Sequence, residues 1–406
     1  MEIRPVKTEE LIHYTGICKS VFFTDERMDI YQAIKDNNPG PDANEDESKN
    51  VVWGYFDEKG ILQSALTVIP YTIRMNGKNV KMGGIGGVVT RPEYRGRGCI
   101  NQIFEKAFPA MEEAGQVFSY LYPFSHRYYR MFGYELCNTL NNIDIDISSF
   151  EAFKYPKNAE ALQPNQDIKP YADIYNEYTK NKNLSVVRSD DDWKQILKRD
   201  PYKNLAFAFL FKTDNKPVAY ILYDVNVDNN DHSHGLNVKE CCFINKDGLH
   251  QVLGFIGKLG ADFGYGKVIW HNFPDDMNMY TLMAEPYDVN WSTGRGGMNR
   301  LVSVLPALKT LEAPTGSGKV VINVTDDFLK NNTGIYEISW ESGTLNVKKQ
   351  ENTEADLITS VQTLAQLITG YTTIDQVRYK PCTTINSDGL LNKLFTKKSI
   401  YIVERF

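Results

Sequence analysis

One stretch, residues 86–101, constrains the fold of this 406-residue chain more than any other. It begins with two glycines and two valines, passes through Arg91 and Pro92, and ends in alternating arginines and glycines. Valine favours strands, and a proline ends strand pairing and disfavours helix at the residue before it. The following run, residues 100–111, has apolar residues at helical spacing. The stretch therefore predicts a buried strand, a sharp turn and the first turn of a helix.

The turn in this stretch is typical of an anion-binding site. Its glycines leave backbone N–H groups bare, and the N–H groups and dipole of a helix N-terminus both favour a negative ligand. Arg95 and Arg97 add two cations suited to a pyrophosphate. The turn is not a Walker loop, which needs Lys-Ser/Thr after its last glycine, and its spacing is not Gly-x-Gly-x-x-Gly. An ordinary glycine-rich turn with solvated arginines is the alternative interpretation.

The pattern Arg-x-x-Gly after an apolar strand and a proline resembles the acetyl-CoA-binding motif of the GNAT N-acetyltransferases. Where that motif usually carries Gly or Ala, this chain has Ile100. A second signal follows one helix and one strand later, where Tyr129 precedes the sequence Phe-Gly-Tyr. In GNAT enzymes a short helix at this point ends in Gly-Phe or Gly-Tyr and carries a tyrosine beside the thioester. Together the two signals predict a catalytic GNAT domain over residues 1–145.

Composition limits the class of protein. A chain of 406 residues predicts two or three domains, and 42% apolar with 24% charged residues is ordinary for a soluble globular protein. The net charge of −6 disfavours nonspecific binding to nucleic acid or anionic membranes and is compatible with cationic substrates. The six cysteines include no Cys-x-x-Cys pair, which favours a reducing cytoplasm. The N-terminus has no apolar signal core, and the longest apolar run, residues 205–211, is too short to span a bilayer.

Beyond residue 145 the sequence predicts two more domains. Residues 146–290 repeat an α/β pattern, but both arginines and one glycine are missing where a second Arg-x-x-Gly loop should lie. We interpret this region as a degenerate second GNAT domain that no longer binds coenzyme A. Residues 291–406 resemble the sterol-carrier-protein-like fold, with helices expected over 356–368 and 387–394 and a strand-like run over 399–406. The predicted fold class is α/β (α+β), with tandem GNAT domains followed by a sterol-carrier-protein-like domain.

This layout is similar to that of the Eis (enhanced intracellular survival) family of acetyltransferases. The resemblance implies transfer of acetyl to a primary amine (of an aminoglycoside, a polyamine-like molecule or a lysine) and assembly as a hexamer. It also implies that Tyr129 is the general acid toward the coenzyme A thiolate and that the C-terminal carboxylate of Phe406 is the general base. A phenol with a pKa of about 10 keeps its proton at neutral pH, whereas an α-carboxylate, with a pKa of roughly 3.5, is a weak base unless desolvated.

The same resemblance implies acetyl-CoA as the cosubstrate and no metal. The strand backbone would pair with the pantetheine arm, the loop and first helical turn would hold the pyrophosphate, and the end of the next strand would flank the arm. The residues implied are Val88, Val89, Thr90, Arg95, Gly96, Arg97, Gly98, Cys99, Ile100, Asn101, Phe124 and Ser125.

Several side chains have competing interpretations. Tyr129 also fits a packed aromatic cluster, and a C-terminus is often frayed. His126 is an alternative base because imidazole titrates near neutrality. Cys99 resembles a nucleophile, but GNAT transfer is direct, so we interpret it as a small filler. His232 and His234 offer a weak metal site. The acids Asp25, Glu26 and Glu135 either attract a cationic substrate or are simply solvated.

Two other classes of function fit the same sequence. A noncatalytic acetyl-CoA sensor or scaffold would keep the glycine-rich loop without needing Tyr129 or a free Phe406 carboxylate. A lipid-binding protein would use the C-terminal domain. We expect a small-molecule or peptide amine as the acceptor, a homo-oligomer by family analogy, and neither nucleic acid nor membrane as a partner.

Overall fold

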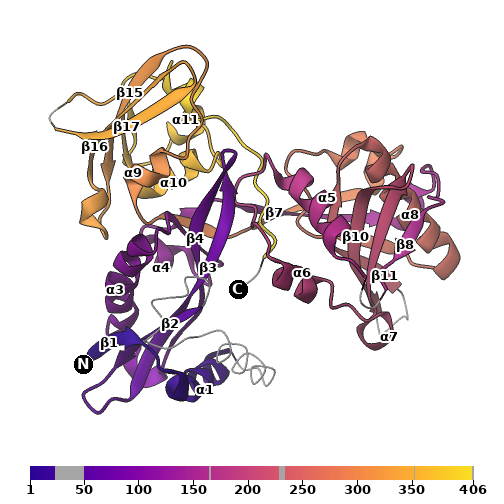
Figure 1. Ribbon diagram of the computed structural model, residues 1–406, viewed down its shortest axis with the longest axis horizontal. Coiled ribbons are helices and arrows are strands. Elements are labelled where there is room, and N and C mark those ends of the chain that lie inside the picture. Colours follow the sequence, from indigo (N-terminus) through magenta and orange to yellow (C-terminus); the bar gives the residue numbers. More distant parts are fainter. Residues whose placement is uncertain (23–49, 164–165, 228–233, 352, 405–406) are drawn as a thin grey trace. The chain divides into compact units, whose positions relative to one another are not determined.

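The computed structural model describes residues 1–22, 50–163, 166–227, 234–351 and 353–404 (Figure 1). The chain divides into two compact units. The first contains Met1–Cys137, Gly297–Lys398 and the segment from Glu404 onward, and the second contains Asn138–Gly296 and Ser399–Val403. The first unit is therefore assembled from segments that lie on both sides of the second unit in the sequence.

The first unit is built on a seven-stranded sheet with the order β1-β2-β3-β4-β5-β14-β6. Its first four strands form an antiparallel meander: β1 (Glu2–Pro5), β2 (Val51–Phe56), β3 (Leu62–Met75) and β4 (Lys78–Thr90). The remaining elements are α3 (Cys99–Glu113), β5 (Phe118–Leu121), α4 (His126–Arg130), β6 (Glu135–Leu136) and β14 (Met298–Leu301). Strands β4 and β5 pair in parallel because α3 connects them as a crossover helix.

Two helices cover opposite faces of this sheet. Helix α3 buries Ile100, Ile103, Phe104 and Phe108, as the apolar spacing predicts, in a cluster with residues of β3, β5 and α4. Helix α1 (Leu11–Phe22) packs on a separate apolar cluster formed with β2, β3 and β4. Because strand side chains alternate between faces, successive residues of β3 contribute to different clusters. The sheet is thus buried on both sides along β2 to β4.

A second sheet with five strands, β17-β16-β15-β18-β19, also lies in the first unit. Its strands are β15 (Gly318–Thr325), β16 (Gly334–Glu341), β17 (Thr344–Gln350), β18 (Leu357–Ser360) and β19 (Thr384–Ile385). Its helices are α9 (Val304–Leu308), α10 (Val361–Ile368), α11 (Ile374–Val377) and α12 (Leu391–Leu394). The Gln366 side chain of α10 donates to the carbonyl of Leu136 at 2.7 Å, which ties this region to the seven-stranded sheet.

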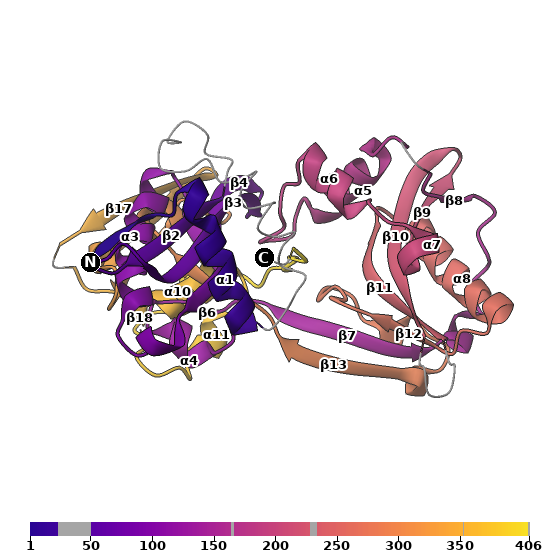
Figure 2. The ribbon, with the colours of Figure 1, turned by 90° about the horizontal axis from the view of Figure 1, so that it is seen from below.

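The second unit has its own seven-stranded sheet, of order β13-β7-β12-β11-β10-β9-β8. Figure 2 shows the long strands β7 and β13 side by side. The strands are β7 (Thr139–Asp146), β8 (Ala159–Ala161), β9 (Ala206–Thr213), β10 (Lys216–Val227), β11 (His234–Phe243), β12 (Lys267–Trp270) and β13 (Val289–Arg295). Helix α8 (Lys246–Phe263) covers one face, and α5 (Lys169–Thr179) and α6 (Asp190–Ile196) cover the other.

The second unit also holds part of the C-terminal segment. Tyr401 is buried in the apolar cluster of α5 and α6. The backbone of Asn183 pairs with this segment, accepting a hydrogen bond from the Tyr401 N–H and donating one to the Ser399 carbonyl. None of the helices in the described ranges has the length and apolar character needed to cross a membrane.

Some predicted elements differ from the structure. The boundary predicted at residue 145 falls inside β7, which belongs entirely to the second sheet, and β14, predicted as part of the third domain, completes the first sheet. Residues 356–368 form a strand and then a helix, and the helix expected over 387–394 is confined to its last four residues. The strand expected at 399–406 is, over its described part, a single bridge between Asn183 and Ile400. At β14 and β18, pairing with distant strands outweighs local propensity.

Candidate active site

Strand β4 contains a bulge just before the residues predicted to hold a cofactor. Gly87 has a φ of +54°, and the pairing with β3 shifts so that Gly87 and Val88 together oppose Leu66. The ladder between β4 and β5 ends at the pair Ile85–Leu121, whereas β4 stays paired with β3 as far as Thr90. The two parallel strands therefore separate, and the β5-facing backbone edge of β4 is available to an extended ligand over Val88, Val89 and Thr90.

Tyr14, which the sequence analysis did not identify, holds this bulge from α1. Its hydroxyl lies 2.9 Å from the Thr67 hydroxyl and donates to the Gly87 carbonyl at 3.3 Å. A Cβ atom on Gly87 would lie 1.7 Å from that hydroxyl, so a residue with a side chain does not fit there. No local pattern indicates this contact, because 73 residues separate the two partners.

The loop between β4 and α3 leaves backbone N–H groups exposed at the start of the helix. Gly98 is the N-cap of α3 with a φ of +73°, and no side chain caps the helix. Gly96 has a φ of +76°, and an added Cβ would meet no atom within 4 Å at either glycine. Arg95 and Arg97 are exposed, and the Arg97 guanidinium lies 4.7 Å from the centre of the Tyr94 ring. This arrangement fits a pyrophosphate, because open space, unused N–H groups and two cations coincide.

The first turn of α3 shows how the chain accommodates its departure from the Gly or Ala of the motif. Ile100 is 5% exposed and points its side chain into the apolar cluster, so only its backbone N–H belongs to the turn. Cys99 is equally buried, and burial raises the pKa of its thiol, as a filler role predicts. The Asn101 side chain donates to the Glu105 carboxylate at 2.7 Å. All three residues therefore offer backbone rather than side chain to a ligand.

Tyr129 lies in α4, which follows β5 after a short connection. The Ser125 hydroxyl caps this helix by accepting the Tyr128 N–H at 3.3 Å, and Phe124 is 74% exposed and packs edge-on against Tyr129 with ring centres 5.3 Å apart. Tyr129 shares an apolar cluster with Cys99 and Ile100 of α3. Burial, with a smaller contribution from Tyr128, raises the pKa of Tyr129 well above that of a free phenol. Tyr129 is therefore both a packed aromatic residue and a phenol that keeps its proton.

The C-terminal segment reaches the end of β5. The Tyr122 hydroxyl, one residue after β5, donates to the Glu404 carbonyl at 2.9 Å within the first unit. Phe406, predicted to carry the general base, lies outside the described residues, as do Asp25, Glu26 and His232.

Glu135 is neither a free acid nor a solvated one. It is 7% exposed, and Arg130 holds its carboxylate with hydrogen bonds of 2.7 to 3.2 Å. Burial would raise its pKa, but Arg130 and the Leu136 N–H outweigh that effect and lower it. A carboxylate neutralised in this way is a poor anchor for a cationic substrate. His126 is the half-buried first residue of α4, three positions before Tyr129.

Among the described residues, no group of three or more His, Cys, Asp or Glu side chains is arranged to hold a metal ion. All six cysteines are described, and each is a free thiol.

The corresponding junction in the second unit is closed. Strand β11 ends at Phe243 and α8 begins at Lys246, and the Asn245 side chain caps the helix by accepting the Gly248 N–H at 2.8 Å. The Ile244 N–H is also used, by the Val218 carbonyl. The Gly248 N–H, one of the groups that would face an anion, is therefore satisfied within the chain, and the loss of coenzyme A binding stays a prediction.

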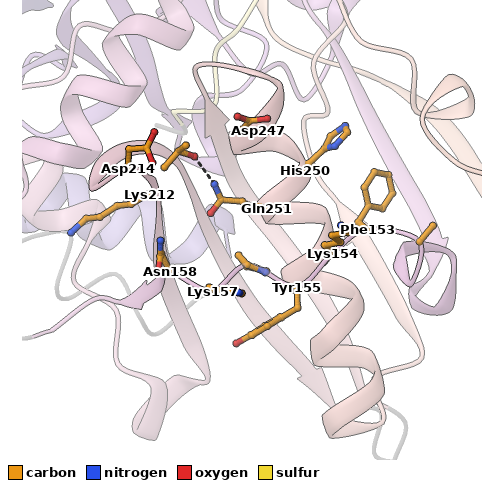
Figure 3. A pocket seen from close by; sticks show the side chains of 13 residues that line it. Phe153, Lys154, Tyr155, Lys157, Asn158, Lys212, Asp214, Asp247, His250 and Gln251 are labelled. Carbon is orange, nitrogen blue, oxygen red and sulfur yellow. Dashed lines mark hydrogen bonds between the residues drawn. The ribbon is translucent and has the colours of Figure 1, made fainter.

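A cavity of about 680 Å³ lies in the second unit, between the loop before β8 and the start of α8. Figure 3 shows its side chains, among them Lys154, Lys157 and Lys212, and the hydrogen bond from Gln251 to Thr213. Lys212 is paired with Glu160, and the lining includes none of the residues predicted for acetyl transfer. We therefore assign this cavity no part in acetyl transfer.

Comparison with known domain families assigns all three parts of the chain. Models of GNAT acetyltransferase domains match residues 2–137 and residues 184–301. A sterol carrier protein domain model matches residues 302–396. Comparison with curated proteins finds no match.

Solved structures with the same fold cover the whole chain. An Enterococcus faecalis protein described as a probable N-acyltransferase has a TM-score of 0.85 and 19% identity, with 100% of this chain and 99% of that chain covered. A GCN5-related N-acetyltransferase from Anabaena variabilis has a TM-score of 0.85 and 20% identity, and Eis1 from Mycobacterium abscessus has a TM-score of 0.79 and 17% identity, both with 100% of each chain covered. At these identities the likeness concerns the fold alone.

The domain matches agree with the local structure. The segments matched as GNAT domains contain the two strand-to-helix junctions, and GNAT domains imply the use of acetyl-CoA. The predicted fold class is confirmed, including the C-terminal domain. The chain thus joins two GNAT domains to a sterol carrier protein domain, and it is an enzyme of the GNAT N-acetyltransferase type.

Proposed function

We propose that this protein is an acetyl-CoA-dependent N-acetyltransferase that transfers acetyl directly to a primary amine in its first GNAT domain. The observation that carries the proposal is the coincidence of an open β4 edge with an uncapped, glycine-rich start of α3. An extended pantetheine arm fits the former and a pyrophosphate fits the latter. Acetyl-CoA supplies an activated thioester when bound.

The chain's own residues then have distinct tasks. Val88, Val89 and Thr90 orient the arm through their backbone, and the start of α3 fixes the phosphates. Tyr129 holds the proton that the departing thiolate requires. Because burial raises the pKa of Tyr129 above that of a free phenol, its loss of a proton would not limit activity below about pH 10.

We also propose the carboxylate of Phe406 as the general base that accepts the amine proton. The support is the hydrogen bond from Tyr122 to Glu404, because it brings the chain to the end of β5 two residues before its terminus. His126, at the start of α4, is the alternative base. Lengthening the chain beyond Phe406 would replace the carboxylate with a neutral amide and test the two assignments against each other.

The acceptor class and assembly follow from resemblance. We propose membership of the Eis family, on the domain order and the fold shared with Eis1 of M. abscessus. That membership would make an aminoglycoside, a polyamine-like molecule or a lysine side chain the acceptor, and a homohexamer the assembly. We expect a reducing compartment such as the cytoplasm, in keeping with six free thiols, and neither nucleic acid nor membrane as a partner.

The test is acetyl-CoA turnover, followed by thiol release, against a panel of aminoglycosides, polyamines and a lysine peptide. We expect Tyr129→Phe to lower kcat by about 10²-fold or more while the acetyl-CoA affinity is kept. Loss of turnover on extension past Phe406 would support the terminal base, and equal turnover would remove Phe406 from the mechanism. Tight acetyl-CoA binding without turnover of any amine would favour the noncatalytic sensor or scaffold. A bound lipid would favour a lipid-binding protein that uses the C-terminal domain.

A further inference from the structure

A buried ion pair lies behind the helix that carries Tyr129. Arg300 on β14 and Asp326 after β15 are 0% and 1% exposed, and the Arg300 Nη2 donates to the Asp326 carboxylate at 2.7 Å. Asp326 is itself fixed, because its other oxygen accepts the N–H groups of Phe328 and Leu329. A buried charge needs such partners, so the pair has one well-defined geometry.

The Arg300 guanidinium occupies the space that a side chain on Gly133 would need. A Cβ atom on Gly133 would lie 2.1 Å from Arg300 Nη1 and 3.0 Å from Nε. These two nitrogens have no hydrogen-bond partner among the described residues, so they face the glycine without bonding elsewhere. Arg300 also lies 5.5 Å from the centre of the Phe108 ring. Gly133 is the glycine of the Phe-Gly-Tyr sequence, and it is required here by Arg300 as well as by its φ of +81°.

The turn around Gly133 is bonded directly to Tyr129. The Tyr129 carbonyl accepts the N–H groups of Phe132 and Tyr134 at 3.0 and 3.3 Å. The Tyr134 hydroxyl is bonded to Ser119 at 2.6 Å, which ties the far end of the turn to β5. The ring of Phe132 in turn packs against Phe328, two residues after Asp326. The position of Arg300 is therefore transmitted to the backbone of Tyr129 through one turn.

We propose that Arg300 is a positioning residue for Tyr129 and that Asp326 of the sterol carrier protein domain holds it in place. The C-terminal domain then takes part in acetyl transfer by fixing the proton donor, without contacting substrate. This inference rests on the proposed role of Tyr129 as the general acid. It gives the buried pair a task that differs from stability alone.

The test compares Arg300→Met with Arg188→Met in the full-length protein. Arg188 is a matched control, because it is also buried and paired with a carboxylate, Glu240, but lies in the second unit. With the most active amine of the panel, we expect Arg300→Met to lower kcat between about tenfold and 10²-fold with the KM for acetyl-CoA within about twofold. Arg188→Met should lower the melting temperature without changing kcat. Equal losses of kcat in the two variants would overturn the proposal.

Two further measurements keep the result interpretable. If Arg300→Met does not fold, the pair Arg300→Met with Asp326→Leu removes both charges and leaves none unpaired. Hydrogen exchange of residues 126–136 should be faster in the folded variant, with residues 91–101 unchanged, and unchanged exchange in both segments would contradict the inference. In a Tyr129→Phe background the Arg300 substitution should have no further effect on kcat. Should Tyr129→Phe alone leave kcat intact, the proposed general acid is wrong, while faster exchange would still support the positioning contact.

Discussion

The two units contain two versions of one junction, a strand followed by a helix that covers the sheet. In the first unit β4 leads to α3 through residues 91–98, and in the second β11 leads to α8 through Ile244 and Asn245 alone. Helix α3 begins at Gly98 with no side-chain cap, whereas the Asn245 side chain satisfies the Gly248 N–H. The same fold thus presents open backbone at one junction and closed backbone at the other.

The difference shows that one fold accommodates both an uncapped and a capped helix start after the same kind of strand. Four N–H groups at a helix start need partners, and an Asn cap supplies one of them from within the chain. A long glycine-containing loop leaves them to a ligand. Two domains that both match GNAT families therefore differ in the backbone groups that they leave open, and we propose that only the first binds coenzyme A.

The largest effect is expected from adding a side chain at the open junction. We expect Gly98→Ala to lower kcat/KM for acetyl-CoA by about 10²-fold, because the new Cβ enters the space assigned to the pyrophosphate and a left-handed φ is unfavourable for alanine. Steady-state kinetics with acetyl-CoA as the varied substrate measures the effect.

The control for this substitution is Gly264→Ala at the end of α8. Gly264 has a φ of +69°, and its Cβ would meet no atom within 4 Å, so its backbone strain matches that of Gly98. Both variants should lose about 1 kcal/mol of stability, but Gly264→Ala should keep its KM. Similar kinetics for the two variants would mean that the loop does not hold the cofactor.

A smaller effect should follow from loosening the β4 bulge. Tyr14→Phe removes the hydroxyl that contacts Thr67 and the Gly87 carbonyl, while the ring stays in the apolar cluster of α1. We expect the KM for acetyl-CoA to rise about tenfold or less, with kcat within about twofold. Thr67→Ser keeps a hydroxyl and should leave KM unchanged. The second unit has no role in this bulge, so a change in KM would assign the arm-binding site to the first unit.

Elements with local signals were predicted well. The apolar spacing over residues 100–111 identified the buried face of α3. The glycine-rich turn before α3 was likewise predicted from a short motif, and the catalytic role of Tyr129 stays a prediction. These features depend on residues that are close in the sequence, so a pattern of 10 to 20 residues contains the relevant physics.

Features that depend on distant pairing were missed. Arg300 falls in the region predicted as the third domain, yet it lies in β14 and pairs with Ser119. Its partner Asp326 and the Tyr14–Gly87 contact have no local signature, because burial of a charge or of a hydroxyl is decided by the assembled fold. Glu135 was considered as an acid that attracts a cationic substrate or is simply solvated. The sequence does not show that Arg130 donates hydrogen bonds to its carboxylate.

The next prediction concerns the side-chain cap at the closed junction. We expect Asn245→Ala to destabilise the second unit by about 1 kcal/mol through loss of the cap, with no change in acetyl-CoA kinetics. Thermal unfolding and steady-state kinetics measure the two effects. Isothermal titration adds a stricter check, because a second equivalent of bound acetyl-CoA in this variant would show that one side chain, and not the short loop, closed the junction.

A further prediction concerns the thiol at the open junction. A cysteine at a helix start usually has a lowered pKa, but burial dominates at Cys99 and raises it, with Arg97 opposing the shift only weakly. A raised pKa leaves less thiolate at pH 7.5, so alkylation by iodoacetamide should be at least about tenfold slower at Cys99 than at the exposed Cys382. The rate at Cys99 should rise with pH, because a larger fraction of the thiol is then ionised. Peptide mass spectrometry resolves the two sites, and rapid modification of Cys99 that acetyl-CoA prevents would mean that the open junction presents a side chain, and not only backbone, to its ligand.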